Sequence, residues 1–309
     1  MSSRAMRPPR LRLRLTSFGH LAYLPQRVAV DQSYFAAAGL DVHLVPHAGP
    51  WTGLIDDLAR RRTDLVIGNV WFALQPARHP DALVPIAHCL RQTRFLLCRR
   101  PSPDVGPFRW ENLAGAVVAV PTDVPTPWVA FREALAVNGV PLDRVRAVVG
   151  YDGREAAHDL RAGAVDFAVL DVERAVEQRF KEVAALADAI GPVPWSVYLA
   201  RRVDVEARPE VYRAFRRAND AALGWIASKR PAGLARFMEH RSALSLRVTR
   251  GSIERYRQLD AWPATSAIDP ADVARWHDIL VRWGLLREPV DWRAALEFAD
   301  AIDSDDPSR

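Results

Sequence analysis

The sequence predicts an α/β fold of two similar lobes around a cleft. Chain length, the order of the predicted elements and the repetition of that order support this fold class. At 309 residues, of which 49% are hydrophobic, the chain can bury a core for two domains of about 100–150 residues each. The basic segment 1–10 and the acidic tail 303–309 lack the apolar content to join that core, so both are expected to be disordered.

The first third of the chain predicts the order β-α-β-α-β. Leu11, Leu13 and Leu15 alternate with polar residues, which is the period of a strand with one buried face. The elements expected after this strand are a helix ending at Gly39, a strand at Leu40–Pro46, a helix at Trp51–Arg62 and a strand at Asp64–Gly68. Such alternation predicts a parallel sheet covered by helices, because parallel strands need crossover connections.

The same order returns in the second third of the chain. The elements predicted there are strand Ala116–Val120, helix Thr126–Asn138, strand Val145–Gly150, helix Arg154–Ala162 and strand Val165–Leu170. Asp64 and Asp166 occupy matching places at the last strand of each set, so the offset between the copies is 166 minus 64, or 102 residues. Since the two copies share negligible sequence identity, the repeat is one of architecture.

Further strands and helices complete the predicted plan. Ala82–Cys89 and Thr93–Arg99 are predicted strands that carry the chain from the first lobe to the second, and Val197–Ala200 is the return. Helices that pack back on the first lobe are then expected at Pro209–Ser228, Pro231–His240, Asp269–Trp283 and Asp291–Ala299.

The two lobes are expected to be discontinuous in the sequence. Lobe 1 is assigned residues 11–91 and 197–302, and lobe 2 residues 92–196. Cys89 and Cys98 flank the first connection and could form a disulfide only if two strands aligned them across a hairpin. A cytosolic location favours two reduced thiols that fill the core, and neither cysteine has a metal-ligating spacing, so no metal is expected.

Composition limits the partners and the location. The net charge of +5 is carried almost entirely by Arg residues spread along the chain, which argues against a nucleic-acid-binding surface. No segment has the basic start and continuous apolar run of an export signal, and none reaches the roughly 18 apolar residues of a membrane span. As written, the chain is expected to be cytoplasmic, or periplasmic or at the cell surface if its start is truncated.

Candidate ligand-binding residues lie in loops at the carboxyl ends of the strands, where helix N-termini offer free N–H groups. These ends can face each other across the two lobes. The residues expected to contact a ligand are His20, Tyr23, Gly49, Trp51, Thr52, Asn69, Trp71, Thr122, Asp123, Thr126, Tyr151, Asp152 and Asp171. The aromatic residues predict a flat or heteroaromatic ligand, although aromatic residues also fill cores and hydroxyl or carboxylate residues also cap helices.

A second hypothesis makes the cleft catalytic. The candidates for acid–base chemistry are His20, His47, Asp123 and Asp152. The sequence has no HExxH, GxGxxG, P-loop or GxSxG motif, so neither a nucleotide-dependent reaction nor a hydrolase has its usual support, and no cofactor is expected. A cytosolic sensor is a third possibility, for which the sequence offers no positive feature.

Several segments together carry a family resemblance. They are Ala29–Val45 with its Tyr34-Phe35-x3-Gly39-Leu-Asp-Val pattern, the loop His47–Gly53, the strand Asp64–Gly68, Leu113–Pro121 and Gly284–Asp291. These segments resemble the solute-binding proteins of ABC importers for sulfonates, nitrate and thiamine pyrimidine precursors, a family that includes thiamine-pyrimidine synthase-like proteins. The resemblance implies a type II periplasmic-binding-protein-like fold with a two-strand hinge, a small-molecule ligand in the interlobe cleft, and an ABC permease as partner if the chain is exported.

The chain departs from this family at two points. The transporter members are exported or lipid-anchored, whereas no such signal is visible here. The synthase uses an early active-site Lys, a His and a Cys-rich run, but here no Lys precedes Lys181 and no such run exists. Two functions therefore stay open: a receptor that binds a small molecule in the cleft, or a cytosolic lyase without metal or cofactor, such as a desulfinase, decarboxylase or dehydratase.

Overall fold

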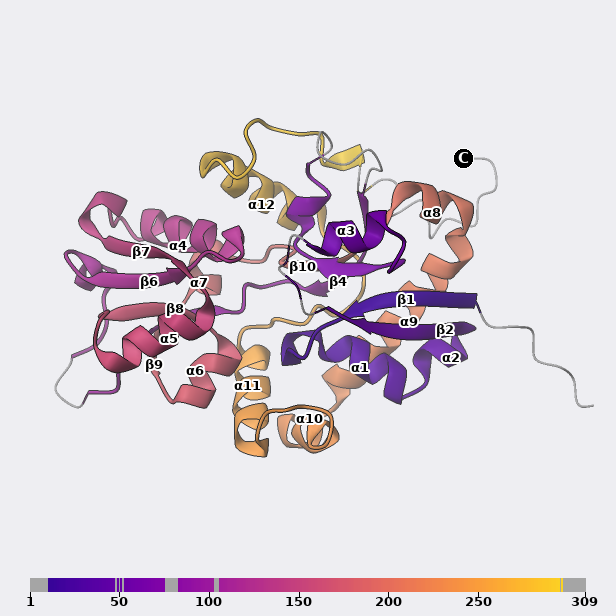
Figure 1. Cartoon of the computed structure of the whole chain (residues 1–309), viewed down its shortest axis with the longest axis horizontal. Coiled ribbons are helices and arrows are strands. Elements are labelled where there is room, and N and C mark those ends of the chain that lie inside the picture. Colours follow the sequence, from indigo (N-terminus) through magenta and orange to yellow (C-terminus); the bar gives the residue numbers. More distant parts are fainter. Residues whose placement is uncertain are drawn as a thin grey trace, which may run out of the picture.

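The structure of the chain, a computed structural model, describes residues 11–47, 49, 51, 53–75, 83–102, 106–294 and 296. Within these residues the chain forms two α/β lobes that lie side by side (Figure 1). The segments 1–10 and 303–309, for which disorder is predicted, lie outside the described residues.

Among the described residues, lobe 1 is built on five strands in two hydrogen-bonded groups. The strands are β1 (Leu11–Ser17), β2 (Leu40–Pro46), β3 (Val66–Gly68), β4 (Leu83–Leu90) and β10 (Ser196–Arg201). β1 pairs in parallel with β2, while β10 lies between β3 and β4 and is antiparallel to both. A parallel bridge between Leu15 and Leu65 joins the two groups, which gives the strand order β2-β1-β3-β10-β4.

Lobe 2 repeats this order. Its strands are β5 (Phe95–Arg99), β6 (Val117–Pro121), β7 (Arg146–Tyr151), β8 (Phe167–Asp171) and β9 (Lys181–Ala185). β6 is parallel to β7 and β8, whereas β5 is antiparallel to β8 and β9, and the order is β7-β6-β8-β5-β9. In each lobe the antiparallel strand arrives directly from the other lobe. The predicted fold class and its two-strand hinge are therefore confirmed, and the boundaries assigned to the lobes stay a prediction.

Helices cover the sheets. They are α1 (Leu24–Asp31), α2 (Tyr34–Ala37), α3 (Gly53–Ala59), α4 (Pro125–Val137), α5 (Gly153–Ala162), α6 (Val172–Gln178), α7 (Leu186–Ile190), α8 (Arg202–Ala207), α9 (Pro209–Ser228), α10 (Pro231–Met238), α11 (Leu246–Gln258) and α12 (Pro270–Arg282). Short 3-10 turns are η1 (Leu21–Tyr23), η2 (Val70–Phe72), η4 (Trp110–Leu113) and η5 (Leu142–Arg144).

Some sequence-based predictions of elements were wrong. The single helix expected before Gly39 is two helices, α1 and α2, because Ser33 adopts a left-handed conformation (φ 58°) that interrupts the helix. The sequence did not predict β9, α6, α7, α8 or α11. Of the helix expected at Asp291–Ala299, residues 295 and 297–299 lie outside the described residues. Cys89 and Cys98 are free and buried in strands of different lobes.

The C-terminal helices hold both lobes. α9 packs on α1 and α2 of lobe 1, as expected. α11 packs on α6 of lobe 2, so closely that a Cβ atom at Gly251 would lie 2.9 Å from Val176 Cγ1. α12 adjoins α4 of lobe 2, where Glu133 accepts hydrogen bonds from Arg282 Nη1 (2.5 Å) and Trp283 Nε1 (2.6 Å). In Figure 1 these two helices flank the junction of the lobes on opposite sides.

Two aspartates at matching places confirm the repeat. The Asp64 amide donates to Arg14 O (2.8 Å), and its Oδ2 accepts from Arg14 N (2.8 Å). In lobe 2 the Asp166 amide donates to Val117 O (2.9 Å), and its Oδ2 accepts from Val117 N (2.8 Å). Each aspartate thus binds both backbone groups of one residue on the neighbouring parallel strand.

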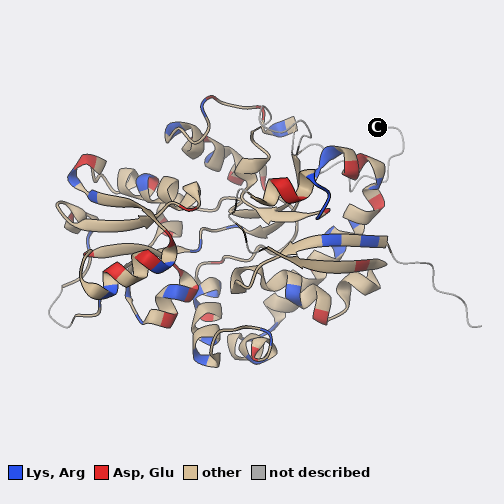
Figure 2. Cartoon of the chain, in the orientation of Figure 1, with Lys and Arg blue, Asp and Glu red and all other residues tan. Residues whose placement is uncertain are grey.

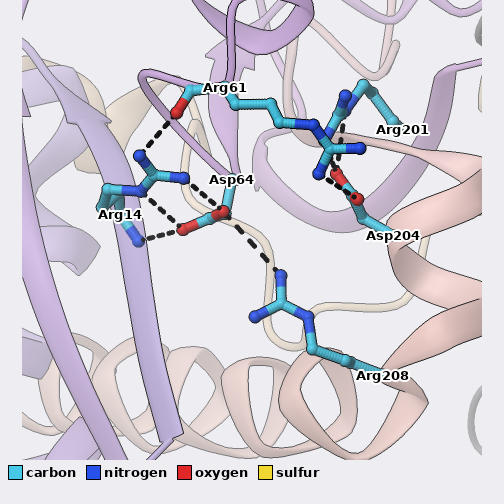
Figure 3. A network of polar contacts seen from close by, with 6 residues as sticks. All are labelled: Arg14, Arg61, Asp64, Arg201, Asp204 and Arg208. Atoms are coloured by element: carbon cyan, nitrogen blue, oxygen red, sulfur yellow. Dashed lines mark hydrogen bonds and ion pairs between the residues drawn. The ribbon is translucent and has the colours of Figure 1, made fainter.

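In lobe 1 a cluster of arginines surrounds Asp64 (Figure 3). Arg14 Nε and Nη2 donate to the two carboxylate oxygens at 3.1 and 3.0 Å, and Arg14 Nη1 donates to Arg61 O (2.5 Å). Arg208 Nη2 lies 3.8 Å from the same carboxylate. Burial alone would raise the pKa of Asp64, but the hydrogen bonds and charge of Arg14 hold that pKa below its usual value.

Charged side chains of both signs are spread over both lobes (Figure 2). Many form ion pairs, such as Arg255 with Glu182 (2.5 Å) and Arg250 with Glu254 (2.8 Å). In the part of the chain that the structure describes, no helix combines the length and the apolar character needed to cross a membrane.

Asp64→Asn is expected to lower the free energy of unfolding by about 1–3 kcal/mol at pH 7, because it weakens the buried contacts with Arg14. Since the pKa of Asp64 is lower in the folded than in the unfolded chain, the ionised carboxylate stabilises the fold above about pH 4. That stabilisation is lost as the pH falls through the folded-state pKa. Urea unfolding at pH 7 and pH 3.5 measures both effects.

The matched control is Asp143→Asn, since Asp143 is exposed in η5. Its stability should match that of the wild type at both pH values. An Asp64→Asn penalty that is equally large at pH 7 and pH 3.5 would contradict the role given to the carboxylate charge.

Candidate ligand-binding cleft

A cleft of about 300 Å³ lies where the two lobes meet. Its lining comes from loops of lobe 1, from the two interlobe connections and from the segment that leads into α4 of lobe 2. The lining residues are Tyr23, Trp51, Gly68, Asn69, Trp71 and Phe72 of lobe 1, Arg94, Phe95, Trp195 and Ser196 of the connections, and Thr122, Asp123, Val124, Pro125 and Thr126 of lobe 2.

Aromatic rings form much of this lining. The ring pairs are Trp51 stacked on Phe18 (centroids 4.6 Å apart), Trp71 beside Phe72 (5.0 Å) and Phe95 beside Trp195 (6.0 Å). Tyr23 is buried, and its burial raises the pKa of the phenol to about 12, so it is a neutral hydroxyl at pH 7. Such rings offer flat faces to an apolar or aromatic ligand.

The lobe 2 wall is polar and includes the N-terminus of α4. Val124 is the N-cap residue, and no described side chain caps this helix end. Pro125 and Pro127 have no N–H, so Thr126, which carries the first N–H of the helix, lies at the cleft together with the positive end of the helix dipole. Thr126 in the first turn is buried, and Thr122 Oγ1 accepts a hydrogen bond from Gly150 N (2.8 Å). Burial, with the nearby charge of Asp152, raises the pKa of Asp123.

Arg94 supplies a positive charge at the base of the cleft. Its side chain is only 8% exposed, and its Nη1 donates to His20 Nδ1 (3.2 Å). Burial first, and then the charge of Arg94, lower the pKa of His20, which favours the neutral imidazole. Because Nδ1 accepts from Arg94, the ring proton belongs on Nε2, and His20 could act as a base only after losing its contact with Arg94.

Glu173 is the carboxylate nearest to Arg94. Its Oε2 lies 3.9 Å from Arg94 Nη1, which is beyond hydrogen-bonding distance. Both oxygens are occupied, since Oε1 accepts from Leu21 N (2.9 Å) and Oε2 accepts from Tyr256 OH (2.6 Å). Glu173 therefore joins lobe 2, lobe 1 and α11 at one buried point.

Asn69 organises the aromatic wall. Its Oδ1 accepts from Trp71 N (3.0 Å) and from Trp276 Nε1 (2.9 Å), while its Nδ2 donates to Trp195 O (2.8 Å). One side chain thus fixes η2, α12 and the connection that leads into β10. The geometry gives Asn69 a positioning role, with at most one N–H left for a ligand.

The structure brings seven of the expected ligand-binding residues together in the cleft: Tyr23, Trp51, Asn69, Trp71, Thr122, Asp123 and Thr126. His20 lies just behind the lining and reaches it through Arg94. Thr52 lies outside the described residues.

Three expected residues have structural partners away from the described lining. Asp152 accepts from the backbone N–H groups at the start of α5 (2.6 and 2.9 Å), and these hydrogen bonds lower its pKa. Asp171 caps α6 by accepting from Arg174 N (2.9 Å). Tyr151 donates to Asp159 Oδ2 (2.7 Å) beside a separate surface hollow. As far as the structure describes them, these side chains are occupied by local contacts.

His47 and Gly49 line another hollow, of about 360 Å³. His47 Nδ1 lies 2.9 Å from Asp57 Oδ2, so this imidazole is paired with a carboxylate. The Phe18 ring contacts both His47 (centroids 5.6 Å apart) and Trp51 (4.6 Å). His47 is thus separated from the cleft by the aromatic wall.

The sequence analysis missed the residues of the interlobe connections. Arg94, Phe95, Trp195 and Ser196 all line the cleft. The available signal was one charged residue, Arg94, beside the apolar run Phe95-Leu-Leu-Cys98, at the point where the chain passes between lobes.

The family profile described as NMT1/THI5-like matches residues 22–232, which is more than half of the chain. The chain belongs to the NMT1/THI5-like family. The resemblance expected from the sequence is thereby confirmed. A comparison with curated proteins finds no match.

Solved structures share the fold of this NMT1/THI5-like protein. The periplasmic aliphatic sulphonate binding protein SsuA from Escherichia coli superposes with a TM-score of 0.74 at 16% identity, covering 94% of this chain and 98% of SsuA. The periplasmic nitrate-binding protein NrtA from Synechocystis PCC 6803 gives 0.64 at 14% identity, covering 96% and 86%. The desulfurization enzyme DSZB gives 0.68 at 16% identity, covering 95% and 99%. Both binding proteins and an enzyme therefore have this architecture.

Metal ligation has no support in the described residues. Nowhere among them do three or more His, Cys, Asp or Glu side chains gather in a group that could hold a metal ion.

Asn69→Ala is expected to lower the free energy of unfolding by about 1–3 kcal/mol, because it removes three hydrogen bonds, two of them buried, and leaves Trp276 Nε1 without its acceptor. Trp fluorescence should change as well, since Trp71, Trp195 and Trp276 lose their shared partner. Asn138→Ala is the control, because Asn138 makes a local hydrogen bond to Ala134 O (2.8 Å) at the end of α4. Equal penalties for the two variants in urea unfolding would refute the positioning role.

Proposed function

We propose that this NMT1/THI5-like protein binds a small aromatic molecule with an acidic group in the cleft between its lobes, as a solute-binding receptor does. The observation that carries the proposal is the combination of aromatic walls with the buried guanidinium of Arg94. Arg binds carboxylates and sulfonates through several N–H groups at once, and the N-terminus of α4 on the facing lobe also favours negative charge.

The size of the cleft and the known relatives support this ligand class. A volume of about 300 Å³ is at the lower end of the range for small-molecule sites. SsuA and NrtA, which share the fold, are named for sulphonate and nitrate, both of which are anions. The rings of Trp51, Trp71 and Trp195 add the apolar faces that an aromatic body requires.

Closure of the lobes on the ligand belongs to the same proposal. A molecule that touches both Trp71 of lobe 1 and Thr122 of lobe 2 stabilises the arrangement in which the lobes are close. An ABC permease would be the partner if the protein works outside the cytoplasm. In the cytoplasm it would act as a receptor without a permease.

The second candidate is a lyase on the same scaffold, which the similarity to DSZB favours. Of the four proposed catalytic residues, Asp123 lines the cleft and His20 contacts the lining residue Arg94, while His47 and Asp152 are engaged elsewhere. Chromatography of each bound ligand after incubation separates the candidates. Unchanged ligand supports the receptor, whereas product formation that is lost in His20→Ala supports the lyase.

The experiment that tests the receptor is calorimetry with aromatic carboxylates and sulfonates, using 2-naphthalenesulfonate as the reference probe. Arg94→Gln is expected to weaken its binding by at least about tenfold, because a charge-assisted contact is lost. Trp71→Ala is expected to weaken binding by about tenfold through the loss of stacking. Arg146→Gln, on the exposed edge strand β7, is the control and should bind like the wild type.

Circular dichroism establishes that each variant is folded before affinities are compared. The cleft is the wrong site if Trp51→Ala, Trp71→Ala and Thr122→Ala are all folded and all bind with wild-type affinity.

A further inference from the structure

We infer that Glu173 makes the cleft selective for ligands with a single negative charge, and that Tyr256 of α11 holds Glu173 in the position that produces this selectivity. The inference rests on the proposed function, because it concerns the charge of the aromatic acid bound there. It assigns a specificity role to a buried carboxylate and gives a helix outside the two repeated units a part in the site.

Arg94 and Glu173 are two buried groups of opposite charge that lie close together. Both side chains are 8% exposed, so their charges interact in a poorly solvated region. At 3.9 Å the two groups attract each other without a hydrogen bond between these atoms. Arg94 therefore keeps N–H groups for a ligand, while Glu173 partly offsets its positive charge.

Hydrogen bonds hold the Glu173 side chain in place. Leu21 N of lobe 1 and Tyr256 OH of α11 each donate to one of its oxygens, at 2.9 and 2.6 Å. Both oxygens therefore act as hydrogen-bond acceptors, which fixes the orientation of the carboxyl group. The close approach of Gly251 to Val176 seats α11 on α6, the helix that carries Glu173. The Glu173 side chain is therefore held in a fixed position beside Arg94, which lines the cleft.

The other charged groups near Arg94 add no second cation to the described lining of the cleft. Asp171 is paired with Arg174 at 3.7 Å, and the contact with Arg94 favours a neutral His20. Asp123 adds a carboxyl group on the lobe 2 wall. A ligand with one negative charge meets Arg94, but a second charge on the same ligand has no further cation in the described lining. It is also repelled by Glu173, which lies outside that lining with its Oε2 3.9 Å from Arg94 Nη1. In a poorly solvated site that repulsion discriminates strongly between a monoanion and a dianion.

The experiment compares two probes with the same aromatic body, 2-naphthalenesulfonate and 2-naphthyl phosphate, by calorimetry on the full chain at pH 8. The sulfonate carries one negative charge, whereas a phosphate monoester with a second pKa of about 6 carries two. The wild type is expected to bind the sulfonate more tightly. Glu173→Gln is expected to shift the ratio of the two affinities toward the phosphate by at least about tenfold.

Tyr256→Phe tests the positioning role separately. It keeps the charge of Glu173 but removes the donor to Oε2, so that this oxygen can pair directly with Arg94. The affinity for both probes is then expected to fall by about tenfold with the wild-type preference retained. Glu182→Gln is the matched control, because Glu182 on β9 pairs with Arg255 away from the cleft lining and should leave both affinities unchanged.

A folded Glu173→Gln variant with the wild-type ratio of affinities would overturn the specificity role. A Tyr256→Phe variant with wild-type affinities would overturn the positioning role, and it does so even if Glu173→Gln fails to fold. Failure of the proposed function has a different signature: the wild type then binds neither naphthyl compound nor any other aromatic acid, and the inference falls with it.

Discussion

The position of β10 is the constraint on which the rest of the structure depends. This strand lies between β3 and β4, although more than a hundred residues separate it from either in the sequence. The lobe 1 sheet is therefore complete only when lobe 2 has been built and the chain has returned. β5 occupies the equivalent place in lobe 2, so each sheet has an inner strand fed directly from the other lobe. Non-local pairing of this kind makes folding slow and makes the two lobes interdependent.

The same two connections explain where the cleft lies and what lines it. They bring Arg94 and Trp195 to the junction of the lobes, where neither lobe alone could place them. Asn69 then ties the Trp195 backbone to η2 and α12, so the aromatic wall and the connection move as one unit. Trp71 and Thr122 belong to different lobes, so a change in the distance between the lobes would change this part of the cleft.

Much of the fold could be predicted because its signals are local. The repeated order of elements, the equivalence of Asp64 and Asp166 and the long helix α9 all follow from short patterns in the sequence. α11 was missed because its buried face alternates apolar residues with Thr249 and Ser252, which leaves no continuous apolar stripe. The break at Ser33 was missed because a left-handed serine has no strong sequence signal.

The site was predictable only in part, for a related reason. Loops after strands pointed to Trp71 and Thr122, which line the cleft. A carboxylate that precedes a helix has the same sequence pattern whether it caps that helix or binds a ligand. Asp152 and Asp171 cap their helices. Arg94 was overlooked because its importance comes from the meeting of two lobes, which no local pattern encodes.

The contact between α4 and α12 bears on the lifetime of any complex. Glu133 accepts two hydrogen bonds from the end of α12, and Arg132 packs over the Trp283 ring at 5.1 Å from its centroid. α4 carries the lobe 2 wall of the cleft, so separating the walls also strains this contact with the last long helix of the described chain. Under the proposed function, the escape rate of a bound molecule is set in part by residues outside the described lining, and mutations in α12 are expected to alter residence time while leaving the binding surface intact.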